Sequence, residues 1–232
     1  MVNKVIICIQ ARLCSTRLKG KILFNFFNKT VIDRIINVAK KVKLKKKIVI
    51  LSGNYKQNYF LKKYAEKNKI DIFFGNEHDV LARFKKYINK NKLKSSLILR
   101  LTSDNYLAQP KIIDHVISSC IKKDYEYCYI KPLSHFAGEL VKASVLLNEK
   151  SKSKIVRNHV TIGIRKNKKV RKLALSQNTM KIDHSRYFTL DTLEDLKVMK
   201  VLEIKYPSLQ KIDCLKTLRL IQKENKNFKK LI

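Results

Sequence analysis

The chain has 232 residues, and 45% of them are hydrophobic, which is enough to bury the core of one large domain. Its formal net charge is +34, carried by 42 lysines and only 10 arginines that are spread through every segment. A surface this basic attracts polyanions, but arginine is the usual reader of bases and phosphates, and no nucleic-acid-binding motif is present. Compositional drift toward lysine explains the charge more simply, so we expect no specific nucleic-acid partner.

The sequence shows no segment of the kind that enters or crosses a membrane. No apolar run reaches the roughly 18 residues that span a bilayer, and the N-terminus lacks the order of a signal peptide. The five cysteines are scattered without a C-x-x-C pair, so they are expected to be reduced thiols. These features predict a soluble, cytoplasmic protein without a membrane partner.

Short apolar runs alternate with stretches of helical spacing in the first half of the chain. Four runs are too short for a helix and are expected to be buried strands. They lie at 5–9, 48–51, 70–74 and 97–101. Helical spacing follows at 31–38, 59–65, 80–88 and 112–117, the last with Pro110 near its first turn. This alternation predicts an α/β fold made of successive βα units on a mainly parallel sheet.

The pattern becomes irregular from 125 to 176, which we interpret as an insertion or dimer arm. Strand-like pieces are expected there at 125–130, 139–145 and 170–175, around a helical stretch at 155–165. A further strand is expected at 186–190, and a helix at 193–202 behind Thr192 as its cap. The rest, 207–232, is expected to be a helical tail of a single domain that spans 1–232.

The segment QARLCSTRLKGK, at 10–21, follows the first predicted strand and is the strongest candidate for a binding site. Ligands of open α/β sheets bind beyond the carboxyl ends of the strands. The segment offers hydroxyls, a glycine and four cations to a polyphosphate: Arg12, Ser15, Thr16, Arg17, Lys19, Gly20 and Lys21. We interpret it as a loop that holds a nucleoside triphosphate, with a solvated basic loop as the alternative.

Two aspartates, Asp104 and Asp191, each stand just past an apolar strand. If they converge from neighbouring strand ends, they would suit Mg²⁺, which takes a few protein oxygens and completes its shell with water and phosphate oxygens. Each has a second interpretation, because Asp104 can begin a turn and Asp191 can cap the helix that follows. The combination with a triphosphate loop favours the metal site.

These residues lie in motifs that resemble a known family. The run IQARLCSTRLKGKIL resembles the ARxxSTRLPGKxL signature of the CMP-sugar synthetases, nearest to cytidylyltransferases of the spore-coat polysaccharide biosynthesis protein F type. These are related to acylneuraminate and 3-deoxy-manno-octulosonate cytidylyltransferases. The resemblance covers about residues 4–205 and continues in register through four motifs: GNEHDVLARF (75–84), RLTSDNYLAQP (100–110), RNHVTIGIRKN (157–167) and FTLDTLEDL (188–196).

The resemblance implies a Rossmann-like nucleotide-diphospho-sugar transferase fold, with a mostly parallel central sheet flanked by helices and a small dimerisation arm in a homodimer. It implies that four side chains contact the CTP phosphates: Arg12, Ser15, Arg17 and Lys21. Ala11 and neighbouring backbone would lie near the nucleotide, and Mg²⁺ would bind Asp104 and Asp191. Asp79 and Arg83 match a segment on the nucleoside side, although a helix cap is an equally good interpretation of Asp79.

The resemblance also implies contacts on the acceptor side. Arg157, His159 and Thr161 match a segment near the acceptor, although His159 is equally consistent with a packed core histidine. Arg100, Arg157 and Arg165 would meet the carboxylate of an acidic sugar. His159 is the only proton acceptor that the sequence suggests for the reaction.

Several positions depart from the family pattern. Lys19 replaces a proline, so the loop is expected to be less rigid. Gly53 stands where an aspartate is common. The acceptor pocket is expected to be altered by Asn105, Tyr106 and Lys142, the last at a position where a carboxylate is usual.

The reaction implied is transfer of CMP from CTP to a nonulosonic or Kdo-like sugar, with release of pyrophosphate, for surface polysaccharide biosynthesis. Arg12, Arg17 and Lys21 would stabilise the departing pyrophosphate. Two alternatives stay open. One is a nucleotidyltransferase of the same fold with another nucleotide or acceptor, such as a phosphonate or polyol phosphate. The other is a non-catalytic polyanion-binding protein.

Overall fold

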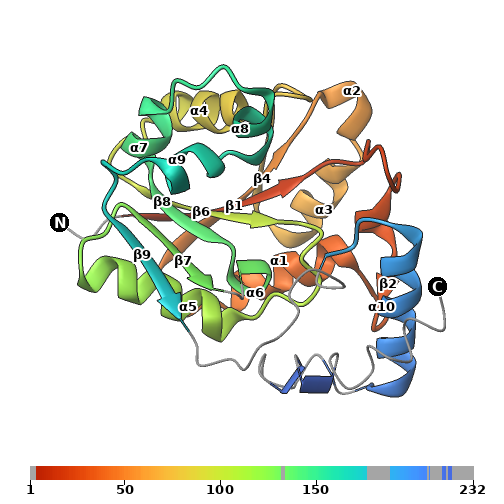
Figure 1. The fold of residues 1–232 in the computed structure, drawn as a ribbon. Coiled ribbons are helices and arrows are strands. Elements are labelled where there is room, and N and C mark those ends of the chain that lie inside the picture. The colour runs from red at the N-terminus through yellow and green to blue at the C-terminus, as the bar shows by residue number, and fades with distance from the viewer. Residues whose placement is uncertain are drawn as a thin grey trace.

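The structure is a computed structural model that describes residues 4–131, 134–176 and 189–207, together with 209, 216–217 and 219–220. Its main strands are β1 (Val5–Ala11), β4 (Lys46–Ser52), β5 (Asp71–Phe74), β6 (Leu97–Thr102), β7 (Tyr127–Lys131), β8 (Glu139–Lys142) and β9 (Lys172–Ser176). They form one sheet in the order β5-β4-β1-β6-β8-β7-β9 (Figure 1).

The sheet is mostly parallel, as the sequence predicts. The pairs β4–β5, β1–β4, β1–β6 and β7–β9 are parallel. Strand β8 runs antiparallel to both of its neighbours, β6 and β7. Because β8 is reversed, its first residue, Glu139, lies at the same edge of the sheet as the last residues of β1 and β6.

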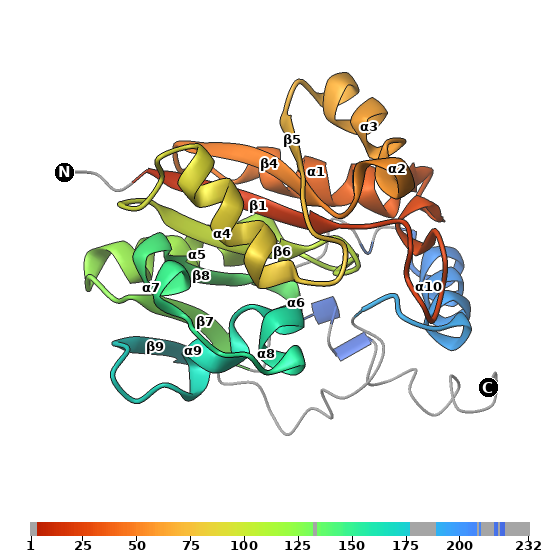
Figure 2. The ribbon, with the colours of Figure 1, turned by 90° about the horizontal axis from the view of Figure 1, so that it is seen from above.

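Helices cover both faces of the sheet. One face carries α1 (Val31–Lys41), α3 (Leu61–Asn68) and α5 (Pro110–Lys122). The other face carries α4 (Val80–Lys90), α7 (Ala143–Asn148), α8 (Lys154–His159) and α9 (Ile162–Lys166), on which Figure 2 looks down. The shorter elements are η1 (Lys21–Leu23), β2 (Asn25–Phe26), β3 (Lys29–Thr30), α2 (Tyr55–Asn58) and α6 (Ser134–Ala137).

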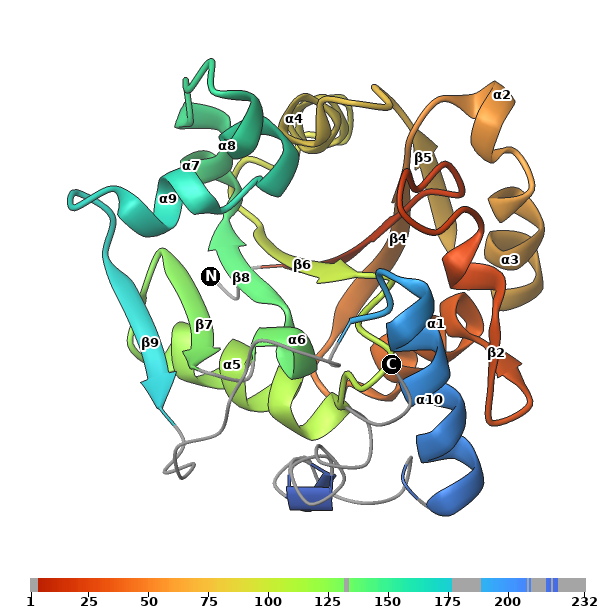
Figure 3. The ribbon, with the colours of Figure 1, turned by 45° about the vertical axis from the view of Figure 1, so that its right-hand side comes forward.

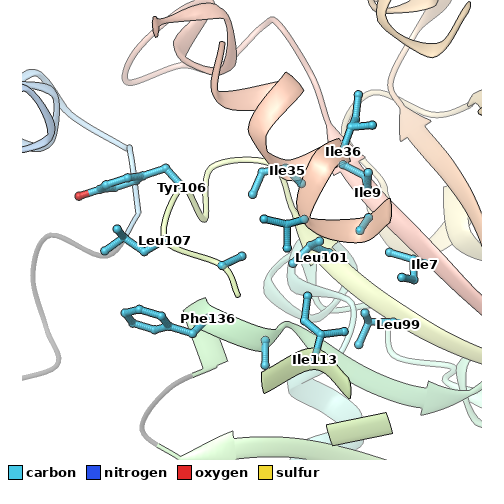
Figure 4. Packing of buried hydrophobic residues seen from close by; sticks show 14 of the residues in the cluster. Ile7, Ile9, Ile35, Ile36, Leu99, Leu101, Tyr106, Leu107, Ile113 and Phe136 are labelled. Atoms are coloured by element: carbon cyan, nitrogen blue, oxygen red, sulfur yellow. The ribbon is translucent and has the colours of Figure 1, made fainter. Parts of the chain in front are cut away.

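The core forms because successive side chains of a strand point to opposite faces. Ile7 and Ile9 of β1 pack with Leu99 of β6 against Ile35 of α1 and Ile113 of α5 (Figure 4). Their neighbours in β1 face the α4 side, where a second cluster lies. All of these side chains are fully buried, and each such burial contributes about 1.5–3 kcal/mol before entropy is counted.

The second half of the chain differs in detail from what its pattern predicts. The strand expected at 139–145 ends at Lys142, because Lys142 pairs with Leu97, the first residue of β6, and the next residue, Ala143, donates its N–H to Ser96. Residues 143–148 form α7 instead. The helix expected at 155–165 is two helices, α8 and α9, separated at Val160, where φ is +61°.

Residues 125–176 do not form a separate body, because β7, β8 and β9 extend the central sheet. Whether this region pairs two subunits stays a prediction. In the segment expected to be a strand at 186–190, residues 189–190 form none and the others lie outside the described residues. Most of the tail at 207–232 also lies outside them. No helix in the described ranges is long and apolar enough to cross a bilayer.

Helix α10 (Leu193–Lys205) brings the end of the chain to the sheet edge. Thr192 caps it as predicted, accepting the N–H of Asp195, while the Asp195 carboxylate accepts the Thr192 N–H in return. Figure 3 shows α10 beside β2, where Glu203 accepts the N–H of Phe27 at 2.5 Å. This docking places Asp191 next to the loop that follows β1.

Candidate active site

A polar cavity of about 560 Å³ opens where β1 and β6 end and β8 begins. Five cationic and three carboxylate side chains line it, so it favours an anionic ligand. The residues that line it include Gln10, Arg12, Ser15, Arg17, Lys21, Arg100, Asp104, Asn105, His135, Glu139, His159, Thr161, Arg165 and Asp191.

The loop after β1 forms the rim of one end of this cavity. Its chain doubles back at Leu13, whose carbonyl accepts the N–H groups of Ser15 and Gly20, both at 3.0 Å. Gly20 has φ +66°, a conformation that a residue without Cβ adopts at little cost, and Leu18 is buried in the core. The loop is therefore anchored at its base although Lys19 in its middle is exposed.

Lys21 joins both predicted metal ligands. Its Nζ lies 2.6 Å from Asp104 Oδ2 and 2.6 Å from Asp191 Oδ1. Arg17 Nη2 adds a third contact at 3.0 Å from Asp191 Oδ1. The four side chains form a compact cluster in which two positive and two negative charges balance.

The environment keeps Asp104 ionised. Burial alone would raise the pKa of its carboxyl, but the Lys21 ammonium and hydrogen bonds from Lys21 and Thr102 outweigh burial and hold that pKa below its ordinary value. Its backbone carbonyl accepts the N–H of Leu190 at 3.1 Å, so the segments that carry the two aspartates are joined directly.

The alternative interpretation of Asp191 as a helix cap is wrong, because Thr192 caps α10. Asp104 does belong to a turn, as its alternative interpretation held, but its carboxylate points to Lys21. The Lys21 ammonium shows that both carboxylates can hold one cation. Within the described residues no cluster of three His, Cys, Asp or Glu side chains suits a metal, so a divalent ion here would need water or phosphate oxygens as well.

Glu139 forms the centre of the other end of the cavity. It is 6% exposed, and its Oε2 accepts hydrogen bonds from Arg100 Nη1 at 3.0 Å and from Thr161 Oγ1 at 2.6 Å. Its Oε1 accepts the Tyr127 hydroxyl at 2.5 Å and a bond from Arg165 Nη2. Burial alone would raise the pKa of Glu139, but these partners outweigh it and the pKa lies below its ordinary value.

The two arginines around Glu139 are held in fixed positions. Arg100 Nε donates to Gln10 Oε1 at 2.9 Å, which ties β6 to β1. The Arg165 guanidinium lies 4.5 Å from the centre of the Tyr129 ring, a cation–π contact. Since one carboxylate serves two guanidinium groups, this end of the cavity keeps a positive charge.

Two histidines line the cavity. His159 is exposed, so the interpretation as a packed core histidine is wrong. The other, His135 of α6, lies in none of the motifs that the sequence shows. Burial lowers the pKa of His135, and the carboxylates of Asp104, Glu139 and Asp191 oppose that shift only in part, so the imidazole is neutral at neutral pH.

Four of the residues implied by the resemblance lie outside the cavity lining: Ala11, Asp79, Arg83 and Arg157. The Ala11 side chain is buried in the core at the end of β1. Asp79 caps α4 by accepting the Ala82 N–H at 2.9 Å, as its alternative interpretation held. Its second oxygen accepts Arg157 Nε at 2.7 Å, so this ion pair ties α8 to α4.

Arg83 is 1% exposed and donates to backbone carbonyls of the segment before α4. Its Nη2 donates to the carbonyls of Asn76 and Glu77, and its Nη1 faces the carbonyl of Leu51 at 3.4 Å. Burial lowers the pKa of Arg83 to about 10, which leaves it charged at neutral pH. This geometry gives Arg83 a structural task, so we do not place it among the ligand contacts.

The departures noted in the sequence fall mostly outside the acceptor end. Lys142 lies at the far end of β8 and pairs with Asp124 at 2.8 Å. Tyr106 is fully buried and packs edge-on against Phe26, with ring centres 5.2 Å apart. Of the three altered positions, Asn105 is the one that lines the cavity.

Polar residues within or at the start of mainly apolar strands are the signal that could have found Gln10 and Glu139. Gln10 is the polar residue of β1, and Glu139 begins β8 directly opposite Arg100 of β6. Such residues are costly to bury unless they have partners. They mark the floor of the cavity.

A mostly parallel α/β sheet with a cationic loop after its first strand, facing two paired carboxylates, defines a nucleotide-binding α/β protein. Residues 6–229 match the cytidylyltransferase family, so the chain belongs to that family and is a nucleotidyltransferase that uses CTP. The family resemblance inferred from the motifs is thereby confirmed.

Known proteins resemble the chain over most of its length. It is 29% identical over 210 residues to the spore coat polysaccharide biosynthesis protein SpsF of Bacillus subtilis, with 86% of each chain covered. A solved cytidylyltransferase of Leptospira borgpetersenii has a TM-score of 0.81 at 24% identity, with 97% of this chain and 96% of that chain covered. The CMP:2-keto-3-deoxy-manno-octonic acid synthetase solved with CTP has a TM-score of 0.62 at 13% identity and covers 88% of this chain and 100% of its own. At these identities the two structures support the fold.

Proposed function

We propose that this cytidylyltransferase transfers CMP from CTP to an acidic sugar of the nonulosonic or Kdo-like type, with release of pyrophosphate. The observation that carries the proposal is the division of one cavity into two ends. One end has the cationic loop and the Lys21–Asp104–Asp191 cluster, and the other has two arginines arranged around Glu139.

The nucleotide belongs at the first end. Arg12, Arg17 and Lys21 supply fixed positive charge to the phosphates, and Ser15 supplies a hydroxyl. The backbone at Ala11, where β1 ends, would adjoin the nucleoside. These side chains neutralise the charge that develops as pyrophosphate leaves, which is the main contribution a protein makes to such a transfer.

Asp104 and Asp191 would hold Mg²⁺. Their oxygens already converge on one cation, and carboxylates that bind a phosphate-bridged Mg²⁺ need to supply only one or two of its ligands. When bound, the ion supplies positive charge that polarises the α-phosphate. Lys21 would then be free to contact phosphate oxygens.

In the reaction, a hydroxyl oxygen of the sugar forms a bond to the α-phosphorus of CTP. The bond between that phosphorus and the oxygen that bridges to the β-phosphate breaks, and pyrophosphate leaves with the electron pair. The hydroxyl proton passes to solvent or to a nearby base, for which His159 at the cavity rim is the candidate from the sequence.

The acidic sugar belongs at the second end. Arg100 and Arg165 carry one more positive charge than Glu139 neutralises, and a carboxylate on the acceptor matches that charge. His159 and Thr161 line the same end. Arg157 is committed to Asp79, so we leave it out of the acceptor contacts.

The test is release of pyrophosphate by purified protein with CTP, Mg²⁺ and a panel of keto-sugar acids, each paired with its reduced or neutral counterpart. We expect release with at least one acid, none without acceptor, and much less when UTP, ATP or GTP replaces CTP. Release with neutral sugars at the same rate would contradict the acceptor assignment. No release with any acid would contradict the proposed reaction.

We also propose that the protein forms a homodimer and contributes to surface polysaccharide biosynthesis. The resemblance of 125–176 to the region where this family pairs its subunits supports the first point, and the polysaccharide role named for the Bacillus subtilis relative supports the second. Light scattering that gave the mass of one chain, 27.2 kDa, would contradict the dimer.

A further inference from the structure

A buried carboxylate lies behind the loop that carries Arg12, outside the cavity lining. Glu77 is 9% exposed and stands in the turn between β5 and α4. Its Oε2 accepts the backbone N–H of Asn54 and the amide Nδ2 of Asn58, both at 2.8 Å. Burying a carboxylate is costly unless both oxygens have partners, so the surroundings of the second oxygen, Oε1, decide what this group does.

Asn58 connects this carboxylate to the phosphate loop. It is fully buried at the end of α2, and its Oδ1 accepts the backbone N–H of Leu13 at 2.8 Å. Figures 1 and 3 show the loop after β1 beside α2. The Asn58 amide therefore uses its oxygen to hold the loop next to Arg12 and its nitrogen to hold Glu77.

The second oxygen of Glu77 faces Arg12. Glu77 Oε1 is buried and makes no hydrogen bond to any residue in the described ranges, but Arg12 Nη1 lies 3.9 Å from it. Arg83 holds the same turn by donating to the Glu77 carbonyl at 3.1 Å. The Glu77 carboxylate, held by Asn54 and Asn58, thus lies next to Arg12, the first cation of the loop.

Gly53 makes room for this arrangement. A Cβ on residue 53 would lie 1.8 Å from Glu77 Oε2, so a side chain here would displace the Glu77 carboxylate from its present position. The backbone at Gly53 lies outside the positive-φ region, so the space taken by Glu77 is what favours glycine here. The carboxylate of residue 77 fills the volume into which a side chain at 53 would project.

We propose that Glu77 is a positioning residue that orients Arg12 toward the polyphosphate, with Asn58 as its link to the loop backbone. The inference rests on the proposed function, because it assigns Arg12 to the phosphates. Arginine loses side-chain entropy when it binds, and a partner that holds the guanidinium beforehand lowers that cost. The turn between β5 and α4 therefore acts on phosphate binding without touching the ligand.

The test is a double-mutant cycle between Glu77→Gln and Arg12→Met, with binding of inorganic triphosphate measured by calorimetry. Inorganic triphosphate probes the phosphate loop without the base or the acceptor. We expect Glu77→Gln to weaken binding about tenfold when Arg12 is present and less than twofold when Arg12 is methionine. Equal losses in both backgrounds, or no loss in the first, would overturn the proposal.

Two further variants separate positioning from general stability. Glu66→Gln removes a carboxylate that is 65% exposed on α3, and it should leave triphosphate binding unchanged. In the double variant Glu77→Ala, Gly53→Asp, a carboxylate enters the volume of the Glu77 carboxylate from residue 53. This variant should recover most of the binding that Glu77→Ala loses. Failure of this double variant to improve on Glu77→Ala, with both folded by circular dichroism, would also count against the proposal.

The same measurements distinguish the role of Glu77 from the proposed reaction. Coupled binding of triphosphate without turnover on any sugar would leave Glu77 in its role and contradict the proposed reaction. Turnover on a sugar with uncoupled binding of triphosphate would support the proposed reaction and contradict the role of Glu77. A wild-type protein that binds neither CTP nor triphosphate would overturn both.

Discussion

The ammonium of Lys21 lies 2.6 Å from Asp191 Oδ1, although 170 positions separate the two residues in the chain. The same ammonium is 2.6 Å from Asp104 Oδ2. The carboxylates of Asp104 and Asp191 are thus close enough to repel each other unless a cation lies between them. Lys21 therefore stabilises the proposed metal site in the absence of the metal.

Replacing Lys21 by methionine should make folding depend on a divalent ion. In EDTA we expect Lys21→Met to cost about 2 kcal/mol, below the usual cost of breaking a buried pair because both aspartates are 24% exposed. That loss corresponds to a melting temperature lower by about 4–8 °C, and Mg²⁺ should restore part of it. Lys19→Met, in the exposed part of the same loop, is the control. An identical deficit with and without Mg²⁺ would contradict a shared cation site.

Asp104→Asn should abolish turnover while the fold survives. The amide keeps the size of the side chain but removes the charge that would bind Mg²⁺, and loss of several kcal/mol of charge stabilisation corresponds to at least about a hundredfold in rate. Pyrophosphate release and thermal unfolding measure the two effects. Asp71→Asn, at a carboxylate that is 56% exposed, is the matched control. Full activity of Asp104→Asn would exclude it as a metal ligand.

Glu139→Gln should lower stability in a way that depends on pH. In the folded protein the pKa of Glu139 lies below its ordinary value of 4.5, so its contribution to stability is present above 4.5 and is lost as the pH falls through the folded-state pKa. We expect the variant to be less stable by about 2 kcal/mol at neutral pH, with Arg165 only partly buried. Urea unfolding at a series of pH values measures this difference. A difference that stayed constant below 4.5 would contradict the assignment.

Asp79 should act through its helix cap and its ion pair rather than through the ligand. Asp79→Ser keeps a cap and loses the ion pair with Arg157, so we expect a loss of about 0.5 kcal/mol. Asp79→Ala loses both, and the expected cost is about 1.5 kcal/mol. Chemical unfolding measures both variants, and the affinity for CTP should change by less than about twofold. A larger loss of affinity in a fully folded variant would return Asp79 to the nucleotide site.

The first half of the chain, which includes the proposed nucleotide end of the cavity, is largely predictable from the sequence. Each of its elements has a local sequence signal. The apolar runs that become β1 and β6 are bounded by polar residues, and Pro110 starts α5 where its fixed φ costs nothing. The loop from Arg12 to Lys21 follows β1 directly. The loop therefore lies at the sheet edge beyond the end of a strand, which is where ligands of such sheets bind.

The acceptor half could not be predicted in the same way, since its chemistry depends on partners far apart in the chain. Glu139 takes hydrogen bonds from Arg100 and Arg165, which stand 39 and 26 positions away. Whether an arginine binds a ligand, as we propose for Arg165, or a backbone carbonyl, as Arg83 does, depends on burial that the sequence does not record. For the same reason the sequence left two interpretations of Asp79 open, of which the structure shows the helix cap.

The reversal of β8 has a consequence for how such a protein can change its substrate. Gly138, with φ +72°, turns the chain into the strand that begins with Glu139, and a Cβ at this position would lie 2.4 Å from the Arg100 carbonyl oxygen. Glu139, the centre of the proposed acceptor end, therefore follows a turn that enters the sheet, whereas the loop from Arg12 to Lys21 and the turn at Asp104 follow strands that leave it. A change in the turn at Gly138 would act first on Glu139 and leave the loop after β1 in place. The two ends of the cavity can therefore change through separate substitutions.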